Sequence, residues 1–453
     1  MKSSQFPADQ TRRCRQPPAA VARARRTVIV APQAWARNEG STITGQLVAL
    51  FATAVGIIIL NVFAPQILVG LIAPELGLGT ATAGLVAMMT VLGYAAGLVF
   101  LVPLADRVEN RRLVLYLLLI AVAAAATVPL MPNALDFLAD LFVLGAASSV
   151  AQVLVPLAAS MARPEIRGRV VGDVMSGLII GILLSRPLAS SLADRFGWRA
   201  FFGVTALTTA GLALMLAWRL PRRQPDTRPA YGSLLASLWH LLRKEPVLRR
   251  RALTAGLCMA AFSAFWTTIA LRLVEAPFHL GQRGIAIFAL VGAGGAVTAP
   301  LAGRAGDRGW TRATTLSAHL LILAALALAA WAGSWASMPP ALALALLGAS
   351  AVLLDVGATA DQTLGRRAVN LLRPEARSRI NGLFVGLFFI GGALGSAATG
   401  LAWSIGGWLA VCGLCASFAT LALLVDWLGW RLSRRECPAL TNSCPTSAPT
   451  NIV

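Results

Sequence analysis

Long apolar runs dominate this sequence and constrain its fold more than any other feature. A helix needs about 20 apolar residues to cross the hydrocarbon core of a bilayer, whereas strands of a membrane barrel are about 10 residues long and alternate in polarity. Twelve long runs can be marked, at 46–72, 82–104, 112–131, 136–160, 170–192, 199–218, 252–275, 284–302, 313–333, 340–364, 379–402 and 407–430. With 57% hydrophobic and only 13% charged residues, the chain is predicted to be an all-α polytopic membrane protein with twelve transmembrane helices.

The Lys and Arg residues between these runs predict the orientation of the chain. Basic residues accumulate on the cytoplasmic side of membrane proteins, and all but five of the 39 fall in the termini or in the loops after every second run. The exceptions are Arg186, Arg195, Arg199, Arg272 and Arg283. Both termini are therefore expected in the cytoplasm. The net charge of +20 has the same origin, so it indicates contact with the lipid bilayer and not with nucleic acid.

Five segments are expected along the chain. Residues 1–44, rich in Arg, Pro and Ala, are expected to be a disordered cytoplasmic tail, and residues 432–453 a second tail. Residues 45–218 and 252–431 are each expected to form a six-helix bundle. The linker 219–251 contains the apolar stretch Ser233–Leu242 between basic residues, a pattern typical of a short helix on the membrane surface.

An internal repeat relates the two halves. "RPEIRGRVVG", Arg163–Gly172, and "RPEARSRING", Arg373–Gly382, lie 210 positions apart and share six of ten residues. The same shift aligns Gln152 with Gln362, Gly181 with Gly391, Gly197 with Gly407 and Trp198 with Trp408. Earlier in each half, a shift of 201 aligns Asp106 with Asp307. Because each half has an even number of runs, the halves are predicted to be parallel repeats with a substrate site between them.

An enzymatic function finds little support in the sequence. The three histidines, His240, His279 and His319, lie on different segments without metal-ligand spacing. Neither a nucleophile elbow nor a phosphate-binding Gly-rich motif occurs. The spacing of Cys412 and Cys415 resembles a redox or metal motif, but on an apolar helix ordinary packing is expected. No catalytic residue, metal site or cofactor is therefore predicted.

The loop after the second run carries a family resemblance. Leu104, Ala105, Asp106, Arg107, Arg111 and Arg112 follow the Gly-x-Leu-Ala-Asp-Arg-x-Gly-Arg-Arg signature of the major facilitator superfamily. Two signature glycines are absent, since Val102 replaces the first and Glu109 or Asn110 the second. "NVFAPQ", Asn61–Gln66, and "LLDVGATADQ", Leu353–Gln362, resemble a bacterial branch of sugar-efflux and drug-efflux permeases. The resemblance covers roughly residues 45–431 and implies a twelve-helix transporter of the bacterial inner membrane.

In that family the charges of this loop latch one conformation of the transporter, and the resemblance implies the same here. Carboxylates at helix N-termini and Arg at helix C-termini are stabilised by about 0.3–1 kcal/mol at exposed sites. Contacts this weak can break and form again during a conformational change. The alternative is that the charges are simply solvated and follow the positive-inside rule. The expected latch residues are Asp106, Arg107, Arg111, Arg112, Asp307, Arg308, Arg167, Arg169, Arg377 and Arg379.

Asp355 is the leading candidate for proton coupling. It lies eleven residues before Arg366, about 16 Å along a helix, which places it near the bilayer midplane. Its partner in the first half is Gly145, so the charge is not part of the repeated scaffold. A charged acid at that depth costs roughly 2.5–3.5 kcal/mol on insertion scales. The alternative is a structural acid that is hydrogen-bonded to a neighbouring helix.

Other polar residues in the runs are candidates for lining a substrate cavity. Arg186 stands opposite Ser396 in the repeat. It either snorkels to the outer surface or forms a structural pair, or it has a role in substrate binding or coupling. Asn61, Gln66, Gln152 and Gln362 either line the cavity or form interhelical hydrogen bonds of about 0.6 kcal/mol.

These features predict a secondary active transporter that moves a small organic molecule by alternating access. Efflux in exchange for protons is the leading interpretation, and the chain is expected to act as a monomer. Uptake or plain facilitation is the alternative within transport, and a non-transporting sensor or scaffold is the alternative outside it.

Overall fold

The computed structural model describes residues 43–222, 224, 230–292, 295, 298–334, 337–373 and 377–435. Within these ranges every regular element is a helix. The helices are α1 (Gly45–Glu75), α2 (Leu85–Ala96), η1 (Gly97–Leu101), η2 (Val102–Asp106), α3 (Asn110–Thr127), η3 (Val128–Leu130), α4 (Ala134–Ser148), α5 (Val150–Met161), α6 (Arg167–Phe196), α7 (Trp198–Arg219), α8 (Tyr231–Lys244), α9 (Pro246–Val274), α10 (Gln282–Gly292), α11 (Thr298–Asp307), α12 (Thr311–Ser334), α13 (Pro340–Asn370) and α14 (Arg377–Arg435). The two predicted tails fall almost entirely outside the described residues.

The predicted runs all fall on helices. Among the described residues, 10 helices are long and apolar enough to cross a membrane. The last two runs share α14, which is interrupted by non-helical backbone at Gly406 and Gly407. The run 284–302 falls on the shorter helices α10 and α11. The all-α membrane fold is therefore confirmed, while the count of twelve spanning helices stays a prediction.

The outward faces of these helices are apolar. Large hydrophobic side chains remain exposed along them, among them Tyr116 on α3, Leu207 on α7 and Leu409 on α14. A soluble monomer rarely exposes so much contiguous apolar surface. These apolar helix faces are therefore expected to contact lipid.

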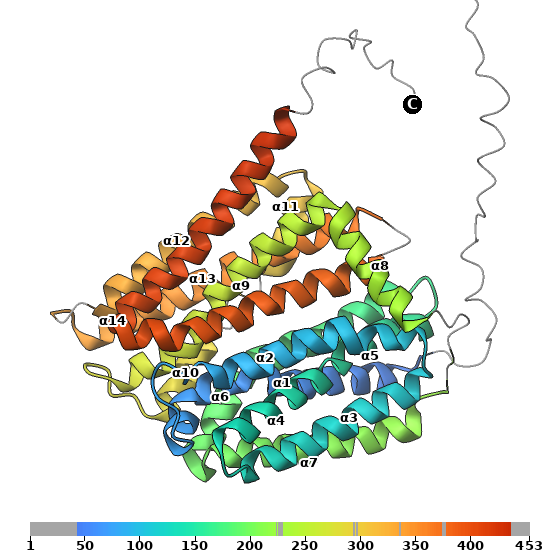
Figure 1. The fold of residues 1–453 in the computed structure, drawn as a ribbon, viewed down its shortest axis with the longest axis horizontal. Helices are drawn as coiled ribbons and strands as arrows, with labels where there is room; N and C mark the ends of the chain where they lie inside the picture. The colour runs from blue at the N-terminus through green and yellow to red at the C-terminus, as the bar shows by residue number, and fades with distance from the viewer. Residues whose placement is uncertain are drawn as a thin grey trace, which may run out of the picture. The chain divides into compact units, whose positions relative to one another are not determined.

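Helices from the first part of the chain pack mainly on one another. α1 packs along α6, α2 along α4, and α3 along α7, while α9 packs along α14 and α12 along α13. Figure 1 shows α1 to α7 gathered on one side, and α9, α12, α13 and α14 on the other. The main contacts between these groups join α2 to α14, α6 to α10, and α1 to α9.

The sequence repeat marks equivalent helix boundaries. α6 begins at Arg167, and the equivalent residue Arg377 is the first described residue of α14. η2 and α11 both end at the duplicated aspartate, Asp106 and Asp307 respectively. The duplication in sequence is therefore a duplication of local structure.

Two of the duplicated glycines make the same close helix contact in each half. A Cβ atom on Gly181 of α6 would lie 2.3 Å from the Gly56 carbonyl oxygen of α1. A Cβ atom on Gly391 of α14 would lie 2.1 Å from the Gly256 carbonyl oxygen of α9. Only glycine allows two helix backbones to approach this closely, so the repeat preserves helix packing.

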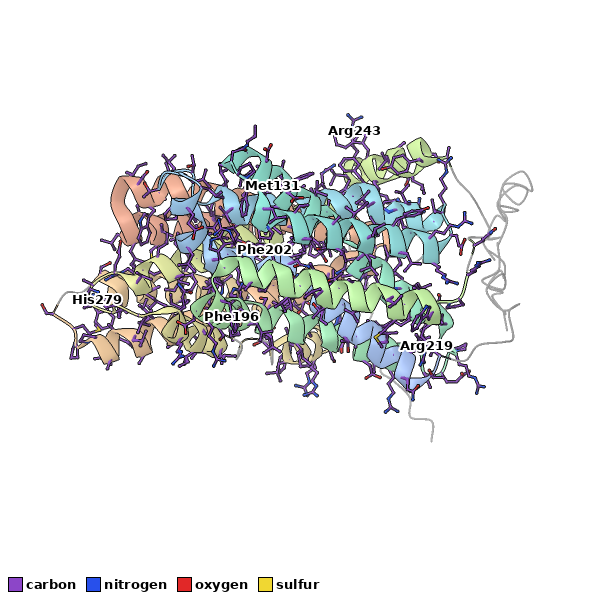
Figure 2. All side chains as sticks on the ribbon, turned by 90° about the horizontal axis from the view of Figure 1, so that it is seen from below. Met131, Phe196, Phe202, Arg219, Arg243 and His279 are labelled. Carbon is purple, nitrogen blue, oxygen red and sulfur yellow. The ribbon has the colours of Figure 1, made fainter. Side chains whose placement is uncertain are left out.

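The loops separate toward two ends of the helices. Figure 2 shows Arg219 and Arg243 toward one end and His279 toward the other. The predicted linker helix is present as α8, whose buried residues Leu234, Leu238 and Leu241 recur at helical spacing. One face of α8 is thus covered, whereas Trp239 on it is exposed.

Candidate functional site

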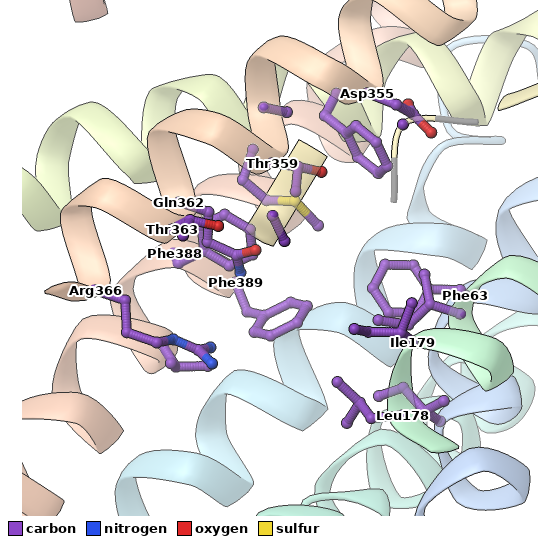
Figure 3. Close-up of a pocket in the computed structure, with 18 of the residues that line it drawn as sticks. Phe63, Leu178, Ile179, Asp355, Thr359, Gln362, Thr363, Arg366, Phe388 and Phe389 are labelled. Atoms are coloured by element: carbon purple, nitrogen blue, oxygen red, sulfur yellow. The ribbon is translucent and has the colours of Figure 1, made fainter. Parts of the chain in front are cut away.

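A cavity of about 470 Å³ lies between helices from both parts of the chain. Its walls are mostly apolar and aromatic, and Figure 3 shows Phe63, Phe388 and Phe389 with Asp355, Gln362 and Arg366 around it. Cavities of this size and character are typical of sites for small organic molecules. The polar side chains in its wall are Tyr94, Gln152, Arg186, Asp355, Thr359, Gln362, Thr363, Arg366, Arg367 and Asn370.

Asp355 lies at the centre of α13 and faces the cavity. It is the sixteenth residue of this 31-residue helix, so the expected depth agrees with the helix bounds. Its carboxylate oxygen Oδ1 accepts a hydrogen bond from Trp266 Nε1 of α9 at 2.9 Å. A Cβ atom on Gly295 would lie 2.5 Å from Asp355 Cβ. A side chain at position 295 would therefore clash with Asp355.

Arg186 packs on the face of the same indole that donates to Asp355. The Arg186 guanidinium carbon lies 4.2 Å from the centre of the Trp266 ring and 5.3 Å from that of Phe262. The side chain is 5% exposed, and its charge interacts with that of Asp355. The snorkelling alternative is therefore wrong, because α6 turns Arg186 toward α9 and not toward lipid or water.

Gln66 and Asn61 do not line the cavity, contrary to the expectation that they would. α1 directs Gln66 behind the wall, where its Oε1 accepts a hydrogen bond from Arg186 Nη2 at 3.2 Å. Asn61 is fully buried one and a half turns earlier on α1, and neither of its amide atoms has a hydrogen-bond partner among the described residues. Gln66 thus takes the interhelical role and positions Arg186.

Gln152 and Gln362, which are equivalent in the repeat, both line the cavity. Gln152 Nε2 of α5 donates to the Tyr94 hydroxyl of α2 at 3.1 Å. The Tyr94 ring packs edge-on against Phe389 of α14, with centroids 4.8 Å apart. Tyr94 therefore joins a polar network in the first half to an aromatic wall in the second.

Arg366 and Arg367 lie on α13 itself and not in a loop, because the helix continues six residues beyond the predicted run and ends at Asn370. Arg367 Nη1 donates to Asp307 Oδ1 at 2.6 Å. Arg366 interacts with Tyr94, and its Nε has no hydrogen-bond partner among the described residues. From Asp355 to Asn370 the cavity wall follows α13 for about 22 Å.

The expected latch residues lie near the same helix ends, with mixed partners. Asp106 at the end of η2 interacts with the charge of Arg379 on α14, which joins the two halves. Arg111 Nη2 donates to the Ala217 carbonyl oxygen, and Arg112 pairs with Glu109 at 3.1 Å. Arg107, Arg167, Arg169 and Arg308 are exposed. The side chain of Arg377 lies outside the described residues.

At the other end of the helices the two halves meet closely. Ser190 Oγ of α6 donates to Gln282 Oε1 of α10 at 2.8 Å, and Arg283 Nε donates to Asp194 Oδ2 at 2.9 Å. A Cβ atom on Gly84, next to α2, would lie 2.2 Å from the Ser396 carbonyl oxygen of α14. Backbones in such contact leave no passage between α2 and α14 at this end.

Three side chains at or next to this cavity were not singled out from the sequence, namely Trp266, Tyr94 and Arg366. Trp266 and Tyr94 sit within apolar runs where an aromatic residue is ordinary. Arg366 was counted among the basic loop residues. A tryptophan or tyrosine that is completely buried needs a partner for its N–H or O–H, and this requirement was the available signal.

Comparison with known proteins identifies a family of membrane transporters. The family model described as Major Facilitator Superfamily matches residues 47–361. The "Uncharacterized transporter YgaY" of Escherichia coli O157:H7 is 37% identical over 385 residues, covering 85% of this chain and 95% of that protein. The "Probable transporter SCO4007" of Streptomyces coelicolor is 32% identical over 373 residues, covering 82% and 85% respectively.

Solved structures share the fold at low sequence identity. The nucleoside transporter NupG superposes with a TM-score of 0.67 at 14% identity, over 84% of this chain and 99% of that one. A bacterial homolog of the human lysosomal transporter Spinster, in an inward-facing and unoccupied conformation, superposes with a TM-score of 0.65 at 15% identity, over 86% and 98%. From its fold, its cavity and its match to the family model, this chain belongs to the major facilitator superfamily.

Proposed function

We propose that this protein is a secondary active transporter of the bacterial cell membrane that exports a small organic molecule in exchange for protons. The observation that carries the proposal is the carboxylate of Asp355, which lies in the cavity wall at the centre of α13 and shares the Trp266 indole with Arg186. A titratable group in the middle of a membrane helix is expensive and marks a functional site by default.

Asp355 and Arg186 supply a simple rule for coupling. When Asp355 is charged, its negative charge balances that of Arg186, which packs on the face of the same indole. Exchange requires that a proton and the substrate exclude each other, so the substrate is proposed to bind while Asp355 is charged and to leave when a proton binds Asp355 and this balance is lost. Proton and substrate thereby change each other's affinity, and such an effect is reciprocal by linkage.

Alternating access then requires the two six-helix bundles, 45–218 and 252–431, to rock against each other. The contacts of Ser190 with Gln282 and of Asp194 with Arg283 close one end. The cavity wall runs to Asn370 toward the opposite end. Under the predicted orientation that opposite end is cytoplasmic. We therefore assign this conformation to an inward-facing state, in which the cavity opens toward the cytoplasm. The Asp106 and Arg379 charges would draw together when that end closes.

The lining of the cavity favours an organic anion. Four charged residues line it, and Asp307 neutralises one of them, Arg367. Asp355 balances Arg186, and among the residues that the structure describes no carboxylate pairs with Arg366. Aromatic walls suit an apolar body, while a guanidinium recognises carboxylate groups in a planar, bidentate fashion. The proposed substrate therefore has an apolar body and a negatively charged group.

Reconstitution tests the proposal directly. The purified chain would be placed in liposomes with an imposed pH gradient, and organic anions, cations and neutral compounds would be screened for gradient-driven flux. We expect accumulation of an anion on the acidic side, abolished by a protonophore. Accumulation on the alkaline side would indicate proton-coupled uptake. Equal flux with and without the pH gradient would refute proton coupling.

A carboxylate away from the cavity serves as the matched control. Asp173 lies exposed on α6, so Asp173→Asn removes a negative charge without touching the cavity. Gradient-driven flux should survive in this variant and be lost in Asp355→Asn. Equal loss in both variants would indicate a general effect of charge and would count against the role of Asp355.

A further inference from the structure

A second buried polar cluster lies apart from the cavity. Cys258 of α9, His319 of α12 and Asp361 of α13 meet there, and each is at most 1% exposed. The Cys258 sulfur, a His319 ring nitrogen and an Asp361 carboxylate oxygen all lie within 4.8 Å of one another. None of the three residues lines the cavity, although their sequence neighbours Met259 and Gln362 do. The cluster is thus one layer behind the cavity wall.

The hydrogen bonds within the cluster leave it incompletely satisfied. His319 Nε2 lies 3.1 Å from Asp361 Oδ1. His319 Nδ1 and Asp361 Oδ2 are buried and have no hydrogen-bond partner among the described residues. A buried polar atom without a hydrogen-bond partner destabilises the folded chain. A further ligand in the cluster would account for atoms that the protein leaves unpaired.

The three side chains offer the donor atoms that zinc prefers. Thiolate sulfur, imidazole nitrogen and carboxylate oxygen are its usual protein ligands. A divalent ion bound to a thiolate, a carboxylate and a neutral imidazole forms an assembly with no net charge. A neutral assembly is what a site inside a membrane requires, because an uncompensated charge there is costly.

We propose that Cys258, His319 and Asp361 form a binding site for a divalent transition metal ion, with zinc as the best match. The ion would tie α9, α12 and α13 together behind the substrate cavity. Three protein ligands leave one coordination position open, so the ion also keeps a place for an exchangeable ligand. The site is independent of the proposed transport function. Its ligands come from three helices, which is why no local spacing in the sequence reveals it.

Cobalt provides a spectroscopic probe of this site. The full-length chain, purified in detergent and stripped with a chelator, would be titrated with Co²⁺ alone. We expect one equivalent to bind per chain and to produce thiolate-to-cobalt charge-transfer absorption with the visible bands of low coordination number. Zn²⁺ should then displace cobalt and abolish both. Binding well below one equivalent, or spectra without a thiolate band, would overturn the proposal.

Conservative variants identify the ligands. Cys258→Ser should abolish the charge-transfer band, and His319→Gln and Asp361→Asn should each weaken metal affinity by about 10-fold or more. Cys415→Ser is the control, because Cys415 is also a buried free thiol but lies outside the cluster. Retention of the band in Cys258→Ser, or its loss in Cys415→Ser, would refute the assignment.

Thermal unfolding gives a test that needs no variant. An ion that binds only the folded chain raises its melting temperature with increasing ion concentration. Zn²⁺ should therefore stabilise the stripped wild-type protein, whereas Mg²⁺, which prefers oxygen ligands, should not. Equal stabilisation by both ions, or by neither, would contradict the site even if every variant failed to fold.

Discussion

The Trp266 indole donates a hydrogen bond to the Asp355 carboxylate over 2.9 Å in the interior of the helix bundle. The face of the same ring lies 4.2 Å from the guanidinium carbon of Arg186. One aromatic side chain thus contacts both Asp355 and Arg186, the first through its N–H and the second through its π face. This relationship links the two halves of the protein at the depth where a proton would act.

Trp266→Phe separates these two contacts. Phenylalanine keeps a ring beneath Arg186 but removes the donor to Asp355. A hydrogen bond to a charged group contributes about 1.5–3 kcal/mol, so we expect gradient-driven flux to fall by roughly 10-fold to 100-fold. Trp310→Phe, at an exposed position, should leave flux unchanged. Wild-type flux in Trp266→Phe would show that the hydrogen bond is dispensable.

Arg366→Gln tests the charge of the substrate. The variant retains a polar side chain but removes a cationic group for which the described part of the chain offers no carboxylate partner. Affinity for organic anions should fall by roughly 10-fold to 100-fold, measured as the concentration giving half-maximal flux, while neutral compounds are unaffected. Arg304→Gln, on the exposed part of α11, is the control. Unchanged anion affinity would remove Arg366 from the substrate site.

Gly391→Ala tests whether the duplicated glycines hold the helices together. The added Cβ atom would lie 2.1 Å from the Gly256 carbonyl oxygen, and overpacking of this kind costs about 1–3 kcal/mol. We expect a lower melting temperature, with the same result for Gly181→Ala in the other half. Gly413→Ala meets nothing within 4 Å and should be neutral or slightly stabilising. Equal melting temperatures for Gly391→Ala and Gly413→Ala would contradict the packing argument.

A disulfide across the closed end should arrest the cycle. Ser190 and Gln282 are in contact, so a Ser190→Cys and Gln282→Cys double variant is expected to form a disulfide under mild oxidation. Transport should stop on oxidation and recover on reduction, while either single variant remains active. Of the six native cysteines, Cys258, Cys412 and Cys415 are buried and are expected to stay unreactive, and Cys14, Cys437 and Cys444 would first be replaced by serine. Full transport by the cross-linked protein would show that this end need not open.

Much of the fold could be predicted because lipid imposes strong rules on sequence. A helix in a bilayer must satisfy its own backbone and present apolar side chains, so each span appears as a long apolar run. The repeat was also visible, and its glycines proved to make the same contact in both halves, as Gly181 and Gly391 show. Asp355 stood out because an acid in such a run is rare.

The rest could not be predicted because it depends on how each helix is rotated. Asn61 and Gln66 are as polar as Gln152, yet only Gln152 reaches the cavity. Depth alone could place Arg186 either at the surface or inside. Only the packing of α6 on α1, with the contacts of Arg186 to Phe262 and Trp266 of α9, decides between them. The cluster of Cys258, His319 and Asp361 is likewise assembled by three helices that are distant in sequence.

Asp355→Asn, assayed by two kinds of flux in the same liposomes, tests the central claim most directly. Asparagine keeps the size and polarity of the side chain but cannot bind a proton in the working pH range. Exchange of labelled for unlabelled substrate, with no pH gradient, should continue at roughly the wild-type rate. Accumulation driven by a pH gradient should be absent. Undiminished gradient-driven accumulation in this variant would contradict the account.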